Sequence, residues 1–345
     1  MYSINFYKIF QDMADPDRII VCLGAILFVS VIGYIIGPIS GNANPWLWSI
    51  LDKLFGFARK SYKVERSSSS LSFRGVLFGL MYIITSGAIG FGAWYGLTHY
   101  YPSLALEILL LSFTMTGGAV WLALSKLHQA LKEGSKLEKG SYRPIAISAR
   151  KNLNTTDDYG ITRVGVAYMP KAFDKGLVAP VFWYLIGGLP LAYLYAGMAC
   201  AVWALSKEGY SKNFGDFILR LEKIFGLLPN TLAGLIMAVA AIFTPTARIT
   251  RIFPYFFKRQ GKASYAEGGF PLTTVAYALG ISLGGPVEDL EGSVIRHGWF
   301  GPKDATARLD KNHINRAIYM SLMAYVLVFA ALMAGLLAWK LNQIN

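Results

Sequence analysis

Long apolar runs alternate with polar segments along the whole chain, and six of these runs are long enough to cross a lipid bilayer. A spanning helix needs about 20 mostly apolar residues. The sequence therefore predicts six membrane spans, at residues 19–38, 75–96, 104–124, 181–205, 225–244 and 317–339. Pro229 and Asn230 interrupt the fifth run, so we expect this span to start later or to be kinked. The predicted fold class is all-α, a polytopic integral membrane helical bundle of about six transmembrane helices.

Positive charge is concentrated in every second polar segment. Twenty-six of the 33 lysine and arginine residues lie in the segments 40–74, 125–180 and 245–316, and positively charged loops stay on the cytoplasmic side. The net charge of +13 then marks a cytoplasmic face that attracts anionic membrane lipid, and we expect no nucleic-acid partner. This pattern predicts a multi-pass protein of the bacterial inner membrane with both termini in the periplasm.

The chain divides into two predicted domains. Residues 1–124 form an N-terminal membrane scaffold of three spans, and residues 125–345 form a region with two basic cytoplasmic polar loops. The first loop, 125–180, precedes the spans near 181–205 and 225–244, and the second, 245–316, lies between the spans near 225–244 and 317–339. The amphipathic segment 209–226, with its phenylalanines and leucines on one side, is predicted to be a separate interfacial helix.

General catalytic motifs are absent from the sequence. It contains neither GxxxxGK[ST] nor HExxH, and its four histidines show no metal-ligand spacing. Cys22 and Cys200 fall inside predicted spans, where small apolar fillers are expected. The residues alone therefore predict a polytopic membrane protein and no particular reaction.

Four sequence islands, taken in order, point to one family. They are residues 176–190 (GLVAPVFWYLIGGLP), 213–221 (NFGDFILRL), 276–286 (AYALGISLGGP), and RHGWFGP followed by NRA at 315–317. This order of motifs resembles the CobD/CbiB family, membrane enzymes that attach an aminopropanol arm to the corrin ring during cobalamin synthesis. The resemblance covers residues 125–321 and is weak before them.

The resemblance implies an adenosylcobinamide-phosphate synthase, an ATP-dependent ligase that joins a corrin carboxylate to aminopropanol phosphate through an amide. Mg-ATP would be the cofactor and a corrin the substrate. The matching positions give catalytic candidates Arg150, Arg163, Asp174 and Glu267, cofactor-binding candidates Gly176, Gly284 and Gly285, and metal-binding candidates Asp157 and Asp158. Each has another interpretation: the arginines anchor lipid headgroups, the paired glycines give close packing or a turn, and the two aspartates N-cap a helix.

Several acidic positions of the family are replaced in this chain. Where the family carries Gly-Arg-Asp-Thr, residues 149–152 read Ala-Arg-Lys-Asn, and further family acids fall on Ala167, Lys171, Lys175 and Leu272. A lysine in place of a carboxylate repels Mg²⁺ instead of binding it.

Two hypotheses follow from these replacements. One is a divergent synthase. The other is a non-catalytic family member, serving as a scaffold or accessory subunit beside a membrane-complex partner or a second copy of the chain. A small-molecule carrier is disfavoured, because no predicted span carries paired charges.

Overall fold

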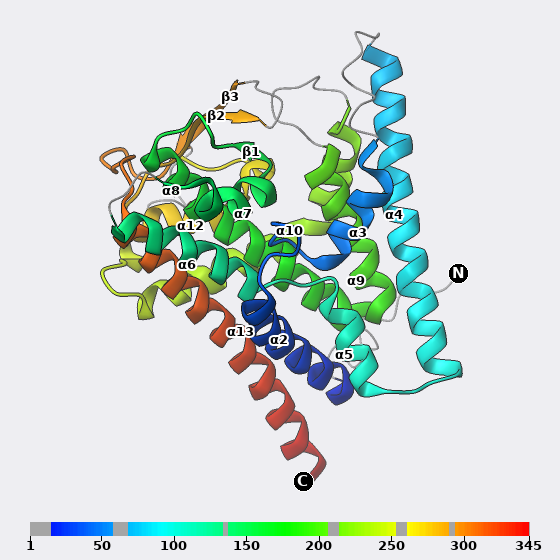
Figure 1. Cartoon of the computed structure of the whole chain (residues 1–345). Coiled ribbons are helices and arrows are strands. Elements are labelled where there is room, and N and C mark those ends of the chain that lie inside the picture. Colours follow the sequence, from blue (N-terminus) through cyan, green and yellow to red (C-terminus); the bar gives the residue numbers. More distant parts are fainter. Residues whose placement is uncertain are drawn as a thin grey trace.

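The computed structural model describes residues 15–57, 68–133, 137–205, 214–252, 261–289 and 294–344. These residues are mostly helical, and a small antiparallel sheet of order β1-β2-β3 lies at the end of the molecule opposite the C-terminal end of α13 (Figure 1). The elements are α2 (Pro16–Ile36), α3 (Trp46–Phe55), α4 (Ser68–His99), α5 (Leu104–Ser112), α6 (Gly118–Glu133), α7 (Lys139–Ala149), β1 (Lys151–Asn152), α8 (Asp158–Phe173), the π-helical turn η2 (Asp174–Val178), α9 (Ala179–Leu205), α10 (Asp216–Phe243), η3 (Ile249–Arg251), η4 (Tyr265–Glu267), α12 (Gly269–Leu279), β2 (Leu283–Asp289), β3 (Val294–Phe300) and α13 (Lys311–Ile344).

Within the described residues, five stretches of helix are long and apolar enough to cross a membrane. They are Pro16–Ile36, Ser72–His99, Asp158–Leu205, Asp216–Phe243 and Lys311–Gln343. Each covers all or nearly all of one predicted span, and only the third predicted span has no counterpart among them. The all-α, multi-pass membrane architecture expected from the apolar runs is confirmed.

The third predicted span, residues 104–124, is not a single helix. The nine residues of α5 cover about 14 Å, less than half of the hydrocarbon core of a bilayer. The turn that follows is held by Thr116, whose hydroxyl donates to the Ala43 carbonyl at 2.6 Å and whose amide donates to the Gly176 carbonyl at 2.8 Å. The next helix, α6, packs tightly on α2, since a Cβ at Gly118 would lie 2.1 Å from the carbonyl oxygen of Ser30. The α5 half of the run is largely exposed, whereas residues 111–120 are mostly buried in protein, so the prediction of a single span is wrong.

The loop predicted over residues 125–180 contains much more helix than expected. Its second half is α8, which continues through η2 into α9 as one helical stretch. The N-cap of α8 is Asp157, whose carboxylate accepts a hydrogen bond of 2.9 Å from the amide of Gly160. The predicted helix cap is therefore confirmed.

The helix α9 is broken inside the membrane-length stretch. Gly187 and Gly188 leave the helical conformation, and Gly188 has φ 65° and ψ −158°, a region open essentially to glycine alone. Arg18 of α2 donates to the carbonyl oxygens of Leu185 and Ile186 at 2.8 and 3.2 Å. The guanidinium thus satisfies carbonyls that the break leaves without helical partners.

The segment 209–226 does not form a separate interfacial helix where it is described. Its residues from Asp216 onward belong to α10, which runs without interruption through Pro229 to Phe243. One face of α10 is buried against the protein, and that face carries Ile218, Glu222, Gly226, Asn230, Ala233 and Met237. Burial of this face stabilises the helix across the proline, and it also buries a carboxylate.

Close contact between α4 and α9 depends on glycine (Figure 1). A Cβ at Gly90 would lie 2.5 Å from the Tyr193 Cβ, and one at Gly197 would lie 2.6 Å from the Ser86 Cβ. The Ser86 hydroxyl donates to the Tyr193 carbonyl at 2.5 Å. Small residues and a hydroxyl at a helix crossing are typical of packing inside membranes.

The small sheet is an addition to the expected architecture. Gly284 and Gly285, interpreted from sequence as a turn or close-packing site, lie within β2 at φ +88° and +80°. The register shifts between Gly284 and Pro286, and a Cβ at Gly284 would lie 2.1 Å from the Gly298 carbonyl oxygen. The glycines therefore form an irregular strand that packs closely against β3.

Candidate functional site

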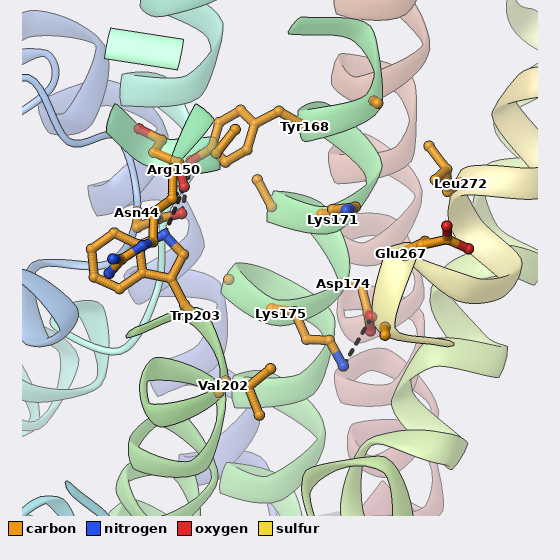
Figure 2. Close-up of a pocket in the computed structure, with 18 of the residues that line it drawn as sticks. Asn44, Arg150, Tyr168, Lys171, Asp174, Lys175, Val202, Trp203, Glu267 and Leu272 are labelled. Carbon is orange, nitrogen blue, oxygen red and sulfur yellow. Dashed lines mark hydrogen bonds and ion pairs between the residues drawn. The ribbon is translucent and has the colours of Figure 1, made fainter. Parts of the chain in front are cut away.

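A cavity of about 230 Å³ opens between α7, α8, α9, α10, η4 and the sheet. Figure 2 shows Arg150 and Trp203 on one side, Glu267 and Leu272 on the other, and Lys171 and Lys175 between them. The charged residues of its lining are Arg150, Lys151, Arg163, Lys171, Asp174, Lys175, Glu222 and Glu267. A concave site with aromatic and aliphatic walls and a few charged groups is typical of small-molecule binding.

Arg150 is buried at the end of α7, where the chain turns from the helix into β1. It is the C-cap of α7 in the left-handed conformation, at φ 55° and ψ 47°. Its guanidinium carbon lies 5.2 Å from the centre of the Trp203 ring. The Trp203 indole donates to the Ser148 carbonyl at 2.7 Å, so the aromatic surface beneath the arginine is fixed by the backbone of α7.

Four positions of α8 and η2, each four residues apart, face the cavity. Arg163, Ala167 and Lys171 share one side of α8, and Lys175 follows in η2. Arg163 is held by a 3.0 Å bond to the Ala307 carbonyl and lies over the Trp299 ring at 5.2 Å. Ala167, Lys171 and Lys175 are positions where the family resemblance expects acids. Their replacements therefore all lie in the cavity wall and make it more basic.

The floor of the cavity is an ion-pair cluster. Lys175 Nζ lies 2.5 Å from Glu222 Oε1 and 3.5 Å from Asp174 Oδ2. Asp174 Oδ2 also accepts from Asn230 Nδ2 at 2.7 Å. Glu222 Oε1 further accepts from the Tyr195 hydroxyl at 2.8 Å. These charges belong to the helical stretches Asp158–Leu205 and Asp216–Phe243 but lie outside the predicted spans 181–205 and 225–244, so the prediction that those spans carry no paired charges stays a prediction.

Tyr265 closes the cluster from η4. Its hydroxyl donates to Glu222 Oε1 at 2.7 Å and accepts a short hydrogen bond from Lys175. Burial raises the pKa of Tyr265 above its usual value, and this effect outweighs the Lys175 ammonium, which lowers it; the Glu222 and Asp174 carboxylates raise it further. Tyr265 is thus a neutral hydrogen-bond donor at physiological pH.

Glu267, a predicted catalytic residue, lies at the rim of the cavity. Its Oε2 accepts from the Ser264 amide at 3.0 Å and from the Ser264 hydroxyl at 2.7 Å, in a capping box at η4. The carboxylate thus fixes the turn that presents Tyr265 to the floor.

The predicted cofactor-binding glycines have packing roles. Gly176 and Gly284 line the cavity, whereas Gly285 is outside its lining. A Cβ at Gly176 would lie 2.5 Å from Thr116 Cγ2, and one at Gly285 would lie 2.6 Å from the Trp299 ring. Close backbone approach accounts for these three glycines.

The predicted metal ligands Asp157 and Asp158 are exposed at the start of α8 and do not line the cavity. Asp157 is engaged as the N-cap. Among the residues that the structure describes, no group of three or more histidine, cysteine, aspartate or glutamate side chains could hold a metal ion. The predicted metal ligands therefore lie outside the cavity, and the capping role accounts for Asp157.

Three residues of the floor were not identified from sequence: Tyr195, Glu222 and Tyr265. Glu222 had a readable signal, since it shares a helical face with Ile218, Gly226 and Asn230 in an apolar segment. A carboxylate on a buried face is costly unless it is paired. No sequence signal pointed to Tyr195 or Tyr265, because tyrosines are common in this chain and only the fold brings these two together.

Comparisons with known proteins agree on one family. The family model described as CobD/Cbib protein matches residues 30–321. The cobalamin biosynthesis protein CobD of Brucella anthropi is 28% identical over 211 residues, covering 58% of this chain and 62%, less than two thirds, of that protein. Its counterpart in Clostridium perfringens is 27% identical over 272 residues, covering 74% and 81%. The Citrobacter koseri protein of the same name is 23% identical over 308 residues, covering 88% and 94%. No solved structure matches the chain significantly.

Proposed function

Because the chain belongs to the CobD/CbiB protein family, we propose that it acts in cobalamin biosynthesis by binding an anionic small molecule in its cavity, without Mg-ATP-dependent ligation. The observation that carries this proposal is the Lys175 ammonium, which lies between Asp174 and Glu222 where a metal-dependent ligase would need free carboxylates. The function is that of a non-catalytic family member, a scaffold or accessory subunit in the membrane.

The charges of the cavity favour an anionic ligand. Lys175 is balanced within the floor by Asp174 and Glu222. The remaining wall carries Arg150, Lys151, Arg163 and Lys171 against the single carboxylate of Glu267. Arginine guanidinium groups bind phosphate and carboxylate groups through paired donors. A phosphate- or carboxylate-bearing ligand complements this excess of positive charge.

The volume of the cavity limits the size of the ligand. Pockets for drug-sized ligands span about 300–1,000 Å³, and this cavity holds about 230 Å³. A small anion, or one anionic arm of a larger molecule such as a corrin, fits such a space. The aromatic rings of Trp48 and Trp203 supply an apolar surface beside the charged group.

A divergent adenosylcobinamide-phosphate synthase is the second candidate. It is favoured by one observation: Arg150, Arg163, Asp174 and Glu267, assigned to catalysis by the resemblance, line the same cavity. This candidate requires Mg-ATP and a corrin substrate, and it predicts amide formation with release of a nucleotide product.

Nucleotide binding by detergent-purified protein tests the proposal. We expect wild-type protein to bind ATP in EDTA-containing buffer, and Arg150→Ala combined with Arg163→Ala to lose this affinity by about 100-fold, because two charge-assisted contacts are removed. Arg143→Ala, at an exposed position of α7, is the matched control and should bind as wild type does. Failure of folded wild-type protein to bind either ATP or inorganic phosphate would refute the proposal. Amide formation from a corrin and aminopropanol phosphate would establish the synthase instead.

A further inference from the structure

The cluster at the cavity floor places one ammonium between two carboxylates in the interior of the protein. Both carboxylate side chains are 1% exposed and that of Lys175 is 18% exposed. All three residues belong to helical stretches long and apolar enough to span a membrane. Isolated charges in such surroundings are strongly unfavourable, so the ammonium and the two carboxylates stabilise one another.

The two carboxylates keep acceptor capacity that their partners do not use. Asp174 Oδ1 and Glu222 Oε2 are buried and have no hydrogen-bond partner. The other oxygen of each carboxylate approaches the same Lys175 nitrogen. Two carboxylates against one ammonium also leave one negative charge in excess. Carboxylates from two separate helices that converge on one point, with oxygens to spare, have the geometry of a cation site.

The backbone explains how a lysine comes to occupy this point. Asp174 and Lys175 are the first residues of η2, a π-helical turn. Consecutive residues of an α-helix point about 100° apart, whereas a π-helical turn adds a residue and widens the helix locally. Asp174 and Lys175 consequently line the same cavity, and the Lys175 ammonium contacts both Asp174 and Glu222 of α10.

We propose that Asp174 and Glu222 form a two-carboxylate cation site whose occupant is the chain's own Lys175 ammonium, held in place of a free divalent ion. An ammonium is a compact point charge with three donors, and it meets the oxygens that a hard cation would otherwise meet. The site then needs no metal, and anionic ligands bind the cavity without divalent cations. Only this last consequence rests on the proposed function.

Manganese binding by Lys175→Met protein tests the inference directly. Methionine keeps the unbranched stem of the side chain, one atom shorter, but removes the charged group, leaving the two carboxylates to share another cation. We expect Lys175→Met to bind Mn²⁺ at least about tenfold more tightly than wild type, and to gain thermal stability when Mn²⁺ is added, because a ligand that binds only the folded state stabilises it. Wild type should show neither effect. Combining Lys175→Met with Glu222→Gln should abolish the gain, and free Mn²⁺ can be measured by paramagnetic resonance.

Every outcome of this experiment decides the question. Mn²⁺ binding by wild type that Asp174→Asn removes would show that lysine is not the occupant. Folded Lys175→Met protein without any gain in Mn²⁺ affinity would show that the carboxylates are no cation site. If Lys175→Met unfolds on purification, Lys175→Gln replaces it, and recovery of folded protein by Mn²⁺ supports the inference. Failure of both variants to fold with Mn²⁺ overturns it. Because no nucleotide is present, these results are independent of ATP binding.

Discussion

Glu222 determines the charge balance of the cavity floor, since Lys175, Tyr195 and Tyr265 all donate to its Oε1. Leucine at this position would keep a side chain of similar volume but leave the ammonium with one carboxylate of the cluster, that of Asp174 at 3.5 Å, beside the hydroxyls of Tyr195 and Tyr265. We predict that Glu222→Leu lowers the free energy of unfolding by on the order of 3 kcal/mol, because it breaks a buried ion pair. Glu222→Gln keeps an acceptor for both phenols and should lose less. Thermal unfolding in detergent measures both, and equal losses would contradict the assigned role of the acceptor oxygen.

Tyr265 provides a pH-dependent test of the same cluster. Its pKa is raised above the usual value of 10.0, chiefly by burial, so the folded protein holds the phenolic proton more tightly than the unfolded chain does. Its contribution to stability is therefore full below about pH 10 and is lost as the pH rises from there through the folded-state pKa. We predict that Tyr265→Phe lowers the free energy of unfolding by about 1 kcal/mol at pH 8. Above pH 10 the free energy of unfolding of this variant should fall less steeply with pH than that of wild type. Parallel pH profiles of the two proteins would refute this.

The residues of the site were predictable from sequence to different degrees. Motif order was sufficient to identify Arg150, Arg163, Asp174 and Glu267, and the structure brings all four to one cavity. What they do there was not predictable, because the cluster is completed by a distant part of the chain: Asn230, which donates to Asp174, and Glu222, which pairs with Lys175, both lie on α10. Long-range pairing of polar groups leaves no local pattern in a sequence.

The first turn of α13 depends on Asp310. Its carboxylate accepts from the amides of Asn312 and His313 and lies 2.7 Å from His313 Nδ1. We predict that Asp310→Ala lowers the free energy of unfolding by about 1 kcal/mol, whereas Asp310→Asn, which keeps a capping oxygen, loses little near neutral pH. Chemical denaturation of the two variants distinguishes them, and equal losses would contradict the capping role.

The same residue gives α13 an acid sensitivity. Partial burial raises the pKa of Asp310, but hydrogen bonds from His313 and Asn312 together lower it more. The pKa of the carboxyl in the folded protein therefore lies below its usual value of 3.8. A lowered folded-state pKa contributes stability above the unfolded value, and that contribution is lost as the pH falls through the folded value. Below about pH 4, the free energy of unfolding of Asp310→Asn should therefore fall less steeply with decreasing pH than that of wild type.

Contact between α4 and α9 can be tested with two glycines of the same helix. Gly90 is buried against Tyr193, whereas an added Cβ at Gly92 would meet nothing within 4 Å. We predict that Gly90→Ala destabilises the protein by about 1–3 kcal/mol through overpacking. Gly92→Ala should leave stability unchanged or raise it by up to about 1 kcal/mol through helix propensity. Size-exclusion profiles and thermal unfolding in detergent report both, and a neutral Gly90→Ala would contradict the close approach.

At the scale of elements, the sequence predicted long apolar helices well and their breaks poorly. Five of the six predicted spans lie in helical stretches of membrane length. The run 104–124 was predicted as one span because hydropathy does not show a turn inside an apolar run, and here Thr116 holds such a turn by donating to the Ala43 carbonyl. The strands were not predicted from the sequence, because β2 contains Gly284, Gly285 and Pro286, residue types that are depleted in strands.

For the molecule as a whole, the sequence predicts that the basic segments and the C-terminal end lie on opposite sides of a membrane. The 34 residues of α13 cover about 51 Å, more than a bilayer core needs. We predict that a membrane-impermeant maleimide labels Gln343→Cys in intact cells but labels Lys303→Cys only after lysis, as basic segments stay in the cytoplasm. Cys22 and Cys200 are buried, so wild type is the unlabelled control. The reverse labelling pattern would show that the chain has the opposite orientation in the membrane.

The most direct test of the central claim is ATP binding to wild-type protein, titrated once with excess Mg²⁺ and once with EDTA. With Lys175 as the resident cation of the floor, the two dissociation constants should agree within about threefold, a difference under 1 kcal/mol. Binding that appears only with Mg²⁺ would contradict the account and point back to a metal-dependent ligase.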